Sequence, residues 1–223
     1  MTTSTVQPEF EPGPEHPQLL GGEVHLWRAR LDGPVTEAAY LLSPSEWLRA
    51  ERFHFRRDRN RYIAGRALLR TALARYGGGD PKELEFSTGP HGKPELVGST
   101  LRFNVSHSGD LFLLAITYGR EVGVDVEEMR EHLPFEMLAD HYFDPEDAWD
   151  LRMLNASEKA YRFYDLWTGT EARLKASGIG LSQGPRVTTP ERWSLLSLRP
   201  ADGFAGALAI EGGHFFLKCW SWQ

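Results

Sequence analysis

The chain has 223 residues, and its 41% hydrophobic and 12% aromatic content is typical of one sizeable globular domain or two small ones, not of a disordered chain. Its formal net charge of −6 argues against a general affinity for nucleic acid. The single cysteine, Cys219, excludes an intrachain disulfide and any cysteine-based zinc site.

Neither a leader nor a membrane span is predicted. Met1-Thr-Thr-Ser-Thr lacks the basic start and the apolar run of a signal peptide. The longest fully apolar stretch, Leu111 to Ile116, is too short to cross a bilayer. We therefore expect a cytoplasmic protein that does not enter a membrane.

In chain order, the first half is predicted to be a mixture of helices and short strands. Residues 1–22 carry four prolines and end in Gly21-Gly22, which favours a flexible N-terminal arm. A first strand is expected from Glu23, a helix opens at Ser43-Pro-Ser-Glu46, and an apolar stripe predicts a second helix over 58–76. Further strands are expected over 84–87, 101–106, 111–118 and 122–127.

The second half repeats this mixture. We expect helical segments over 131–149 and 157–176, followed by strands over 193–198, 204–210 and 215–220. The strands are short and expected to pair antiparallel, which predicts an α+β fold with an N-terminal half over 23–118 and a C-terminal half over 119–223.

Charge is concentrated before the middle of the chain. Residues 49–75 contain nine arginines against two acids, Glu51 and Asp58. Such a patch in an acidic protein indicates a localised anionic ligand, although a solvated helix face explains a run of charge equally well.

Acidic side chains also recur at regular spacing. In Gly123-Val-Asp125-Val-Glu127 the two carboxylates share one face if the segment is a strand, and Glu171 and Lys175 are neighbours on one helix face. Adjacent carboxylates repel unless a cation lies between them, and Mg²⁺ prefers carboxylate, phosphate and water oxygens. The pattern indicates a magnesium site for a phosphate-bearing ligand, while the alternative is the polar face of a half-exposed strand.

Three blocks in this order make the interpretation specific: FNVSHSGD at 103–110, GVDVE at 123–127, and W-T-x-x-E-A-x-x-K-A-x-G-x-G-L at 167–181. Upstream lie RYIAGRALLR at 61–70 and Gly-Lys-Pro at 92–94. Together these blocks resemble the Sfp-type 4′-phosphopantetheinyl transferases, whose fold has two similar α/β halves related by a pseudo-twofold, with the ligand in the cleft between them.

The resemblance implies a reaction and a set of site residues. The 4′-phosphopantetheine arm passes from coenzyme A to a serine of an acyl or peptidyl carrier protein, with Mg²⁺ as the cofactor. The implied Mg²⁺ ligands are Asp125, Glu127 and Glu171, of which Glu171 is also the general base. Lys175 is expected to act on the diphosphate, and the other coenzyme A contacts are Arg61, Lys93, Ser106 and His107.

Several of these residues have simpler explanations. Thr168 and Glu171 fit a capping box at the start of a helix, which would make Glu171 structural. Ser106 and His107 could be turn residues, and Lys93 could belong to a plain Gly-Lys-Pro turn. Arg66 and Arg70 are expected on the helix surface.

The chain departs from the family pattern at two positions. Thr170 stands where the family usually has a lysine, and a hydroxyl cannot neutralise phosphate charge; Arg173 is a candidate substitute. Glu46 stands in a segment where some members carry lysine. The threonine at position 170 suggests an alternative, that the chain is a catalytically impaired homologue that binds coenzyme A. A metal-dependent phosphohydrolase is the other alternative.

The expected partners follow from the family's chemistry. They are carrier domains of fatty-acid, polyketide or non-ribosomal peptide synthesis, met by a monomeric enzyme. The aromatic segment 131–150 is either part of the carrier-binding surface or ordinary core.

Overall fold

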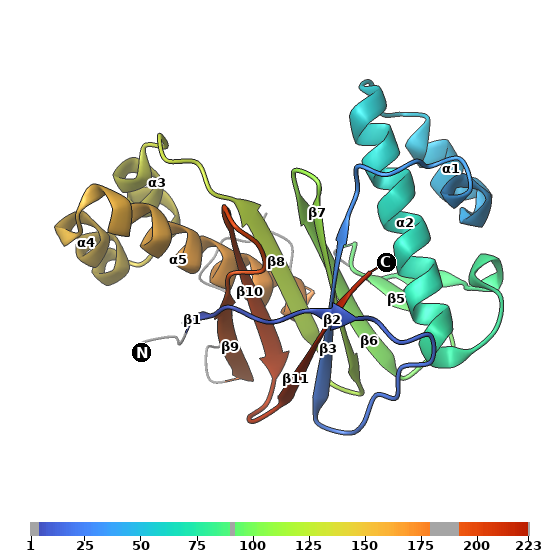
Figure 1. Ribbon diagram of the computed structural model, residues 1–223. Helices are drawn as coiled ribbons and strands as arrows, with labels where there is room; N and C mark the ends of the chain where they lie inside the picture. The colour runs from blue at the N-terminus through green and yellow to red at the C-terminus, as the bar shows by residue number, and fades with distance from the viewer. Residues whose placement is uncertain (1–4, 90–91, 179–191, 223) are drawn as a thin grey trace.

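The computed structural model describes residues 5–89, 92–178 and 192–222, whose elements form four layers (Figure 1). Helix α2 covers a five-stranded sheet, a four-stranded sheet packs against the other face of the first, and α5 covers the outside. The helices are α1 (Pro44–Ala50), α2 (Arg56–Gly77), α3 (Phe135–Tyr142), α4 (Pro145–Met153) and α5 (Ala156–Ser177), with short 3₁₀ turns η1 (Ala38–Leu41) and η2 (Pro81–Glu83).

The five-stranded sheet has the order β2-β11-β3-β7-β6, and the four-stranded sheet the order β1-β9-β10-β8. The first sheet comprises β2 (Glu11–Pro12), β11 (Phe216–Ser221), β3 (Glu23–Arg30), β7 (Leu111–Tyr118) and β6 (Leu101–Ser108). The second comprises β1 (Thr5–Val6), β9 (Trp193–Leu198), β10 (Phe204–Glu211) and β8 (Val122–Glu128). A separate hairpin joins β4 (Phe86–Thr88) to β5 (Pro94–Leu96).

The predicted α+β class is confirmed. Each sheet carries one 22-residue helix on its outer face, α2 on one and α5 on the other. Pairing is antiparallel within β3-β7-β6 and β9-β10-β8, as expected. Parallel pairs occur at β1–β9, β2–β11 and β11–β3, all of which involve segments near the chain ends.

The hydrophobic core lies between the layers because strand residues alternate in direction. Val122, Val124 and Val126 of β8 pack against Leu113 and other residues between the two sheets. A second cluster fills the space between the five-stranded sheet and α2, and small alanines separate the other sheet from α5. This packing fixes the direction of every alternate side chain of β8.

The N-terminal segment differs from the flexible arm that its prolines predicted. β1 pairs with β9, β2 pairs with β11, and Phe10 between them packs against the core between the sheets. The Gly13 amide donates to the carbonyl oxygen of Ser221. A segment with few apolar residues is therefore held mainly by backbone hydrogen bonds, which the sequence pattern does not reveal.

The last strand belongs to the sheet of the first half. β11 lies between β2 and β3, so residues 216–221 complete a sheet that otherwise comes from residues 11–118. A division at 118/119 separates β7 from β8 along the chain, but the halves exchange this strand. The predicted domain boundaries remain a prediction.

Candidate active site

The acidic site lies between β8 and α5, which approach each other closely at Gly123. A Cβ atom on this glycine would lie 2.0 Å from the carbonyl oxygen of Ala172 and 2.4 Å from the amide nitrogen of Ala176. Only glycine permits this contact between a strand and a helix backbone. It places Asp125 and Glu127, two and four residues along the same face, beside Glu171 and Lys175.

Glu171 lies inside a continuous helix, not at a helix start. α5 begins at Asn155, whose side chain and Glu158 form the capping box of this helix. The Thr168 hydroxyl donates to the carbonyl oxygen of Tyr164, as expected one turn inside a helix. The capping-box explanation of Thr168 and Glu171 is therefore wrong, because the helix starts three turns earlier.

Lys175 is the internal counter-ion of the acidic cluster. Its Nζ donates to Asp125 Oδ1 at 2.6 Å and to Ser106 Oγ at 3.0 Å. Asp125 is 3% exposed, and its second oxygen, Oδ2, is buried without a hydrogen-bond partner among the described residues. One lysine thus compensates part of the charge of three carboxylates.

The uncompensated negative charge of the cluster helps to raise the pKa values of Glu171 and Glu127. Burial, and then the charges of Asp125 and Glu127, raise the pKa of Glu171 to about 7, although Lys175 acts in the opposite direction. Burial and the charge of Asp125 raise the pKa of Glu127, and burial raises that of Asp125. Each carboxylate would be more stable beside another cation.

The residues present fit Mg²⁺. Three carboxylates supply hard oxygen ligands, and the buried Asp125 Oδ2 has a lone pair to offer. The described ranges contain no group of three histidine, cysteine, aspartate or glutamate side chains already arranged around one metal position. With Lys175 on Asp125, the site has the donor set for a cation but not yet a closed cage.

Ser106 and His107 belong to β6 and not to a turn. The strand runs to Ser108, and Gly109, with a φ of +56°, begins the turn. Ser106 Oγ donates to Asp125 Oδ1 at 2.9 Å and accepts from the Val126 amide and from Lys175. A hydroxyl has one donor and two acceptor positions, so Ser106 has no capacity left for the predicted phosphate contact in this arrangement.

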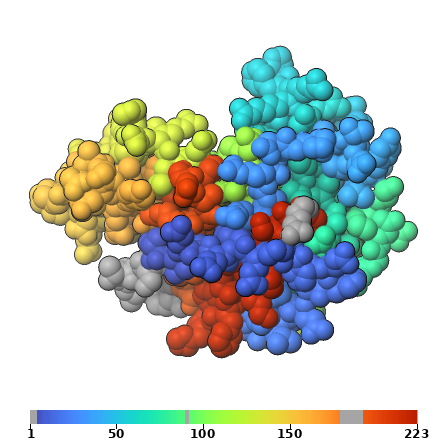
Figure 2. Space-filling model, in the orientation of Figure 1, coloured from blue at the N-terminus to red at the C-terminus, as the bar shows by residue number. Residues whose placement is uncertain are grey.

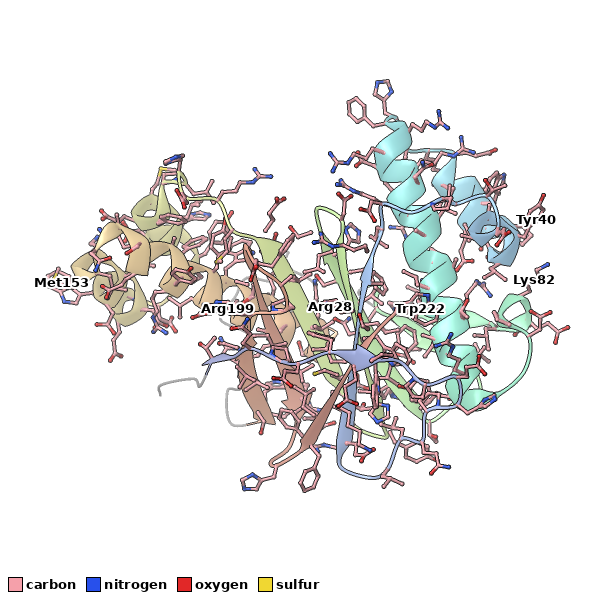
Figure 3. The ribbon with its side chains drawn as sticks, in the orientation of Figure 1. Arg28, Tyr40, Lys82, Met153, Arg199 and Trp222 are labelled. Atoms are coloured by element: carbon pink, nitrogen blue, oxygen red, sulfur yellow. The ribbon has the colours of Figure 1, made fainter. Side chains whose placement is uncertain are left out.

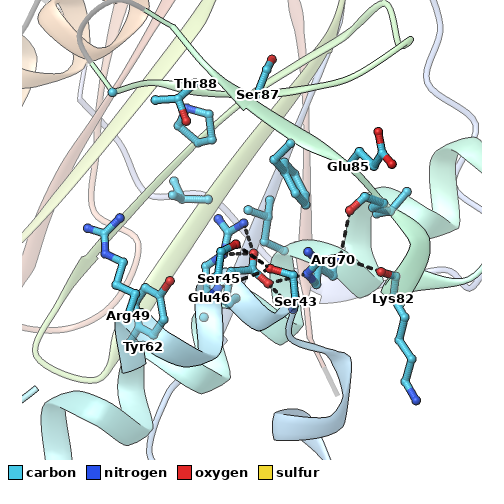
Figure 4. Close-up of a pocket in the computed structure, with 18 of the residues that line it drawn as sticks. Ser43, Ser45, Glu46, Arg49, Tyr62, Arg70, Lys82, Glu85, Ser87 and Thr88 are labelled. Atoms are coloured by element: carbon cyan, nitrogen blue, oxygen red, sulfur yellow. Dashed lines mark hydrogen bonds and ion pairs between the residues drawn. The ribbon is translucent and has the colours of Figure 1, made fainter. Parts of the chain in front are cut away.

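His107 and Arg61 lie on a cavity of about 1050 Å³ lined by α1, α2, the hairpin and β6. Figure 4 shows part of its wall, with Arg49, Tyr62 and Thr88 among the side chains that line it. Partial desolvation, and then the positive charges of Lys175 and Arg61, lower the pKa of His107. His107 therefore feels the charge of Lys175 as well as that of Arg61 in the cavity wall.

Arg61 is already paired. Its Nε donates to Asp110 Oδ1 at 2.7 Å, and Arg57 binds the other oxygen of the same carboxylate. This arginine side chain is 16% exposed. A phosphate at this position must therefore compete with Asp110 for the guanidinium.

Arg70 is buried, which corrects the prediction that it lies on the helix surface. The side chain is 2% exposed, donates to Glu46, and reaches the carbonyl oxygens of Pro81, Lys82 and Leu84 (Figure 4). Arg66 also pairs with Glu46. Glu46 therefore neutralises two arginines, which is the physical reason for an acid at this departure from the family pattern.

Lys93 has partners other than the predicted phosphate. Its ammonium donates to Glu121 Oε2 at 2.7 Å and to the carbonyl oxygens of Val122 and Ala176 at 3.1 Å. All three N–H donors are used, and they connect the hairpin to the start of β8 and the end of α5. A coenzyme phosphate at Lys93 must therefore compete with these partners, and the coenzyme contact stays a prediction.

Arg173, the predicted substitute for the missing lysine, lies beside Thr170, and its role stays a prediction. It lies 3.5 Å from the Thr170 hydroxyl, and the charges acting on it come from Asp147 and Asp144. Within the described ranges we find no contact between Arg173 and the three carboxylates. The Gly180-Leu181 end of the same motif lies outside the described residues.

Comparison with known proteins identifies the family. Residues 26–118 match the model described as 4′-phosphopantetheinyl transferase, N-terminal, and residues 121–221 match that of the 4′-phosphopantetheinyl transferase superfamily. The chain is 37% identical to the 4′-phosphopantetheinyl transferase HetI of Nostoc sp., over 96% of this chain and 99% of the relative. The chain belongs to the 4′-phosphopantetheinyl transferase family. The resemblance predicted from the sequence is confirmed.

Two further relatives are more distant in coverage. A putative 4′-phosphopantetheinyl transferase of Synechocystis sp. is 37% identical over 74% of this chain and 69% of its own length. The transferase Sfp of Bacillus subtilis is 30% identical over 64% of this chain and 62% of its own length. None of this transferase's helices in the described ranges is both long and apolar enough to cross a bilayer.

The segment 131–150 divides between the two explanations offered for it. Phe135 and Phe143 are buried in a cluster with α5, whereas Met137 is 65% exposed. Figure 3 shows Met153, at the end of α4, pointing away from the sheets. This transferase thus buries Phe135 and Phe143 of the segment as core and leaves Met137 and Trp149 of the segment at the surface.

Sequence reasoning missed three residues that fix the position of β8. Gly123 permits the approach of α5, and Asn104 and Ser108 bind the amides of β8 from β6. The signal was present in the period-two spacing of Asn104, Ser106 and Ser108, which puts the three side chains on one face of a strand.

Proposed function

We propose that this transferase moves the 4′-phosphopantetheine arm from coenzyme A to a serine hydroxyl of an apo acyl or peptidyl carrier protein and releases 3′,5′-ADP. The observation that carries the proposal is the meeting of three carboxylates and Lys175 between β8 and α5. Beside it, His107, on which the charge of Lys175 acts, lines a large cavity with arginines in its wall. Figure 2 shows the surface hollowed between α2 and the α3 region.

Coenzyme A fits this layout by charge. Arg61 and His107 lie at the cavity wall, where they can bind phosphate groups of the nucleotide. Lys175, one helical turn from Glu171, lies where its ammonium can shift from Asp125 to the diphosphate. The negatively charged coenzyme thus binds Arg61 and His107 at the cavity wall and Lys175 at the acidic cluster.

Asp125, Glu127 and Glu171 are the proposed ligands of Mg²⁺. When bound, the ion supplies Lewis-acid stabilisation of the diphosphate. Glu171 accepts the proton of the attacking carrier serine, a role that suits a buried carboxylate whose pKa is about 7. Lys175 stabilises the negative charge of the departing 3′,5′-ADP.

The partner is a carrier domain of fatty-acid, polyketide or non-ribosomal peptide synthesis. The exposed methionines of α3 and α4 are the proposed part of the carrier-binding surface, since flexible apolar side chains adapt to a helical partner. Action as a monomer in the cytoplasm, without nucleic acid or a membrane, belongs to the same proposal.

The intact mass of an apo carrier protein tests the function. Incubation with the protein, coenzyme A and Mg²⁺ should add one phosphopantetheine arm, and a metal-free reaction should add none. Asp125→Ala should lose at least about a hundredfold in rate, because it removes a ligand and the partner of Lys175. Glu128→Gln, on the exposed neighbour in the same strand, is the control and should keep its activity.

Three results would contradict the proposal. Full activity of Asp125→Ala in magnesium would remove the metal assignment. No mass gain on several carrier types, with coenzyme A still bound, would instead identify an impaired coenzyme-binding homologue. Release of product from coenzyme A without a carrier would identify a phosphohydrolase.

A further inference from the structure

The two sheets meet at β6 and β8 through side chains. The Asn104 Oδ1 accepts from the Val124 amide at 2.9 Å, Ser106 Oγ from the Val126 amide at 3.3 Å, and Ser108 Oγ from the Glu128 amide at 3.0 Å. Three alternate residues of one strand thus satisfy three alternate amides of an edge strand. We call Asn104, Ser106 and Ser108 the polar seam.

Two members of the polar seam also touch the acidic cluster. Ser106 donates to Asp125 Oδ1, and Ser108 donates to Glu127 Oε2, both at 2.9 Å. Among the contacts of the described residues, the Asn104 side chain binds only the backbone amide of Val124. The seam therefore contains two residues that hold a carboxylate and one that holds backbone alone.

The direction of the Ser108 hydroxyl follows from these contacts. Its oxygen accepts the Glu128 amide, so its one proton is available for Glu127. This hydrogen bond favours one orientation of a carboxylate that Asp125 repels. Side chains that orient a metal ligand in this way typically change metal affinity 10- to 100-fold when they are removed.

We propose that Ser108 is a positioning residue that sets the orientation of Glu127 for binding a divalent cation. The inference rests on the proposed function of this site. Ser108 is the better probe of the seam because Ser106 also binds Lys175, so a change there alters two contacts at once.

Two matched variants test the positioning role of Ser108, Ser108→Thr and Ser108→Val. Their side chains have nearly the same shape, but only threonine keeps the hydroxyl. Mn²⁺ binding to each protein in the presence of coenzyme A, without a carrier, is measured from the paramagnetic resonance signal of free Mn²⁺. Ser108→Thr should bind within about twofold of the unmodified protein, and Ser108→Val about tenfold more weakly. The Mg²⁺ concentration for half-maximal transfer should rise by a similar factor.

Asn104→Ala is the structural control. It removes an acceptor for a β8 amide and should lower the melting temperature, but Mn²⁺ affinity should stay unchanged. Equal Mn²⁺ affinity of Ser108→Thr and Ser108→Val would overturn the inference, and so would a loss of affinity in Asn104→Ala as large as that in Ser108→Val. If the unmodified protein binds no Mn²⁺, the proposed function fails and the inference fails with it.

Discussion

Glu171 is a carboxylate that the fold holds in an unfavourable environment. It is 9% exposed, and its pKa of about 7 reflects burial and the charges of Asp125 and Glu127. A folded-state pKa above the unfolded value of 4.5 means that the folded protein binds more protons between these pH values. The contribution of Glu171 to the stability of the metal-free protein therefore becomes less favourable as pH rises from 4.5 to about 7, and the whole penalty is present above 7.

Glu171→Gln should separate this penalty from catalysis. At pH 8 without metal, the variant should have the higher free energy of unfolding, by up to about 3 kcal/mol, because no charge is buried. At pH 4.5 the difference should disappear, and transfer activity should be lost at every pH. Urea unfolding at the two pH values measures this, and equal stability of both proteins at pH 8 would contradict the explanation.

His25 is a buried histidine far from the acidic cluster in the fold. The Tyr76 hydroxyl accepts from Trp27 Nε1 at 2.7 Å and lies 2.7 Å from His25 Nδ1, while His25 Nε2 lies 3.2 Å from Glu23. Because the Glu23 carboxylate can only accept, we assign the proton of the neutral ring to Nε2, so Nδ1 accepts from the Tyr76 hydroxyl. Burial lowers the pKa of this histidine.

The protein should therefore lose stability in mild acid through His25. A lowered pKa means that the unfolded state binds the extra proton first, so stability is complete above the ordinary value of 6.5 and is lost as pH falls below it. His25→Gln should show a smaller fall in the free energy of unfolding between pH 7 and pH 5. Parallel curves for the two proteins would show that another group controls this range.

At the scale of elements, the contact of β8 with α5 determines the site. Gly123→Ala places a methyl group where the backbone of α5 lies, so the helix must move or the strand must distort. We expect a loss of about 2–3 kcal/mol in stability and a strong loss of transfer, because Glu171 and Lys175 move with α5.

Gly77→Ala is the matched control for this substitution. Gly77 is the last residue of α2, and a Cβ atom there would meet nothing within 4 Å. Its stability should stay equal or rise slightly, since alanine favours helix. If Gly123→Ala has the same stability and activity as the control, the close contact does not set the position of α5.

The sequence predicted these elements well because each has a local signal. The period-two spacing of Asp125 and Glu127 gave β8, and the apolar stripes gave α2 and α5 to within a few residues. The partners of Lys93 and Arg70 could not be predicted in this way. Both donate to backbone carbonyl oxygens, Arg70 to that of Leu84 and Lys93 to that of Ala176, which is distant in the sequence. Such contacts leave no periodic pattern in the sequence.

At the scale of the whole molecule, the N-terminal segment connects the two sheets. β1 extends the four-stranded sheet beside β9, β2 extends the five-stranded sheet beside β11, and Phe10 packs between them. Neither strand is a neighbour of β8 in the sheet order. The segment therefore contributes to stability and not to the acidic site.

Removal of residues 1–12 should separate these properties. The melting temperature should fall by several degrees, since backbone pairs and apolar contacts of both sheets are lost. The transfer rate at a temperature where both proteins are folded should stay within about twofold of the full chain. A truncated protein that melts at the same temperature, or that folds but transfers tenfold more slowly, would contradict this assignment.

The place of β11 also constrains how the chain can fold during synthesis. A ribosome releases residues 23–118 long before residues 216–221, so β3 emerges with one of its two neighbours missing. Local parts such as α2 can form early, but the first sheet closes only after residues 216–221 have left the ribosome. Pairing of β11 with β3 joins residues that are distant in the sequence, and such pairing is slow. Completion of the five-stranded sheet is therefore a late step of folding. Each half therefore needs a strand from the other end of the chain to complete its sheet, and neither folds as an independent domain.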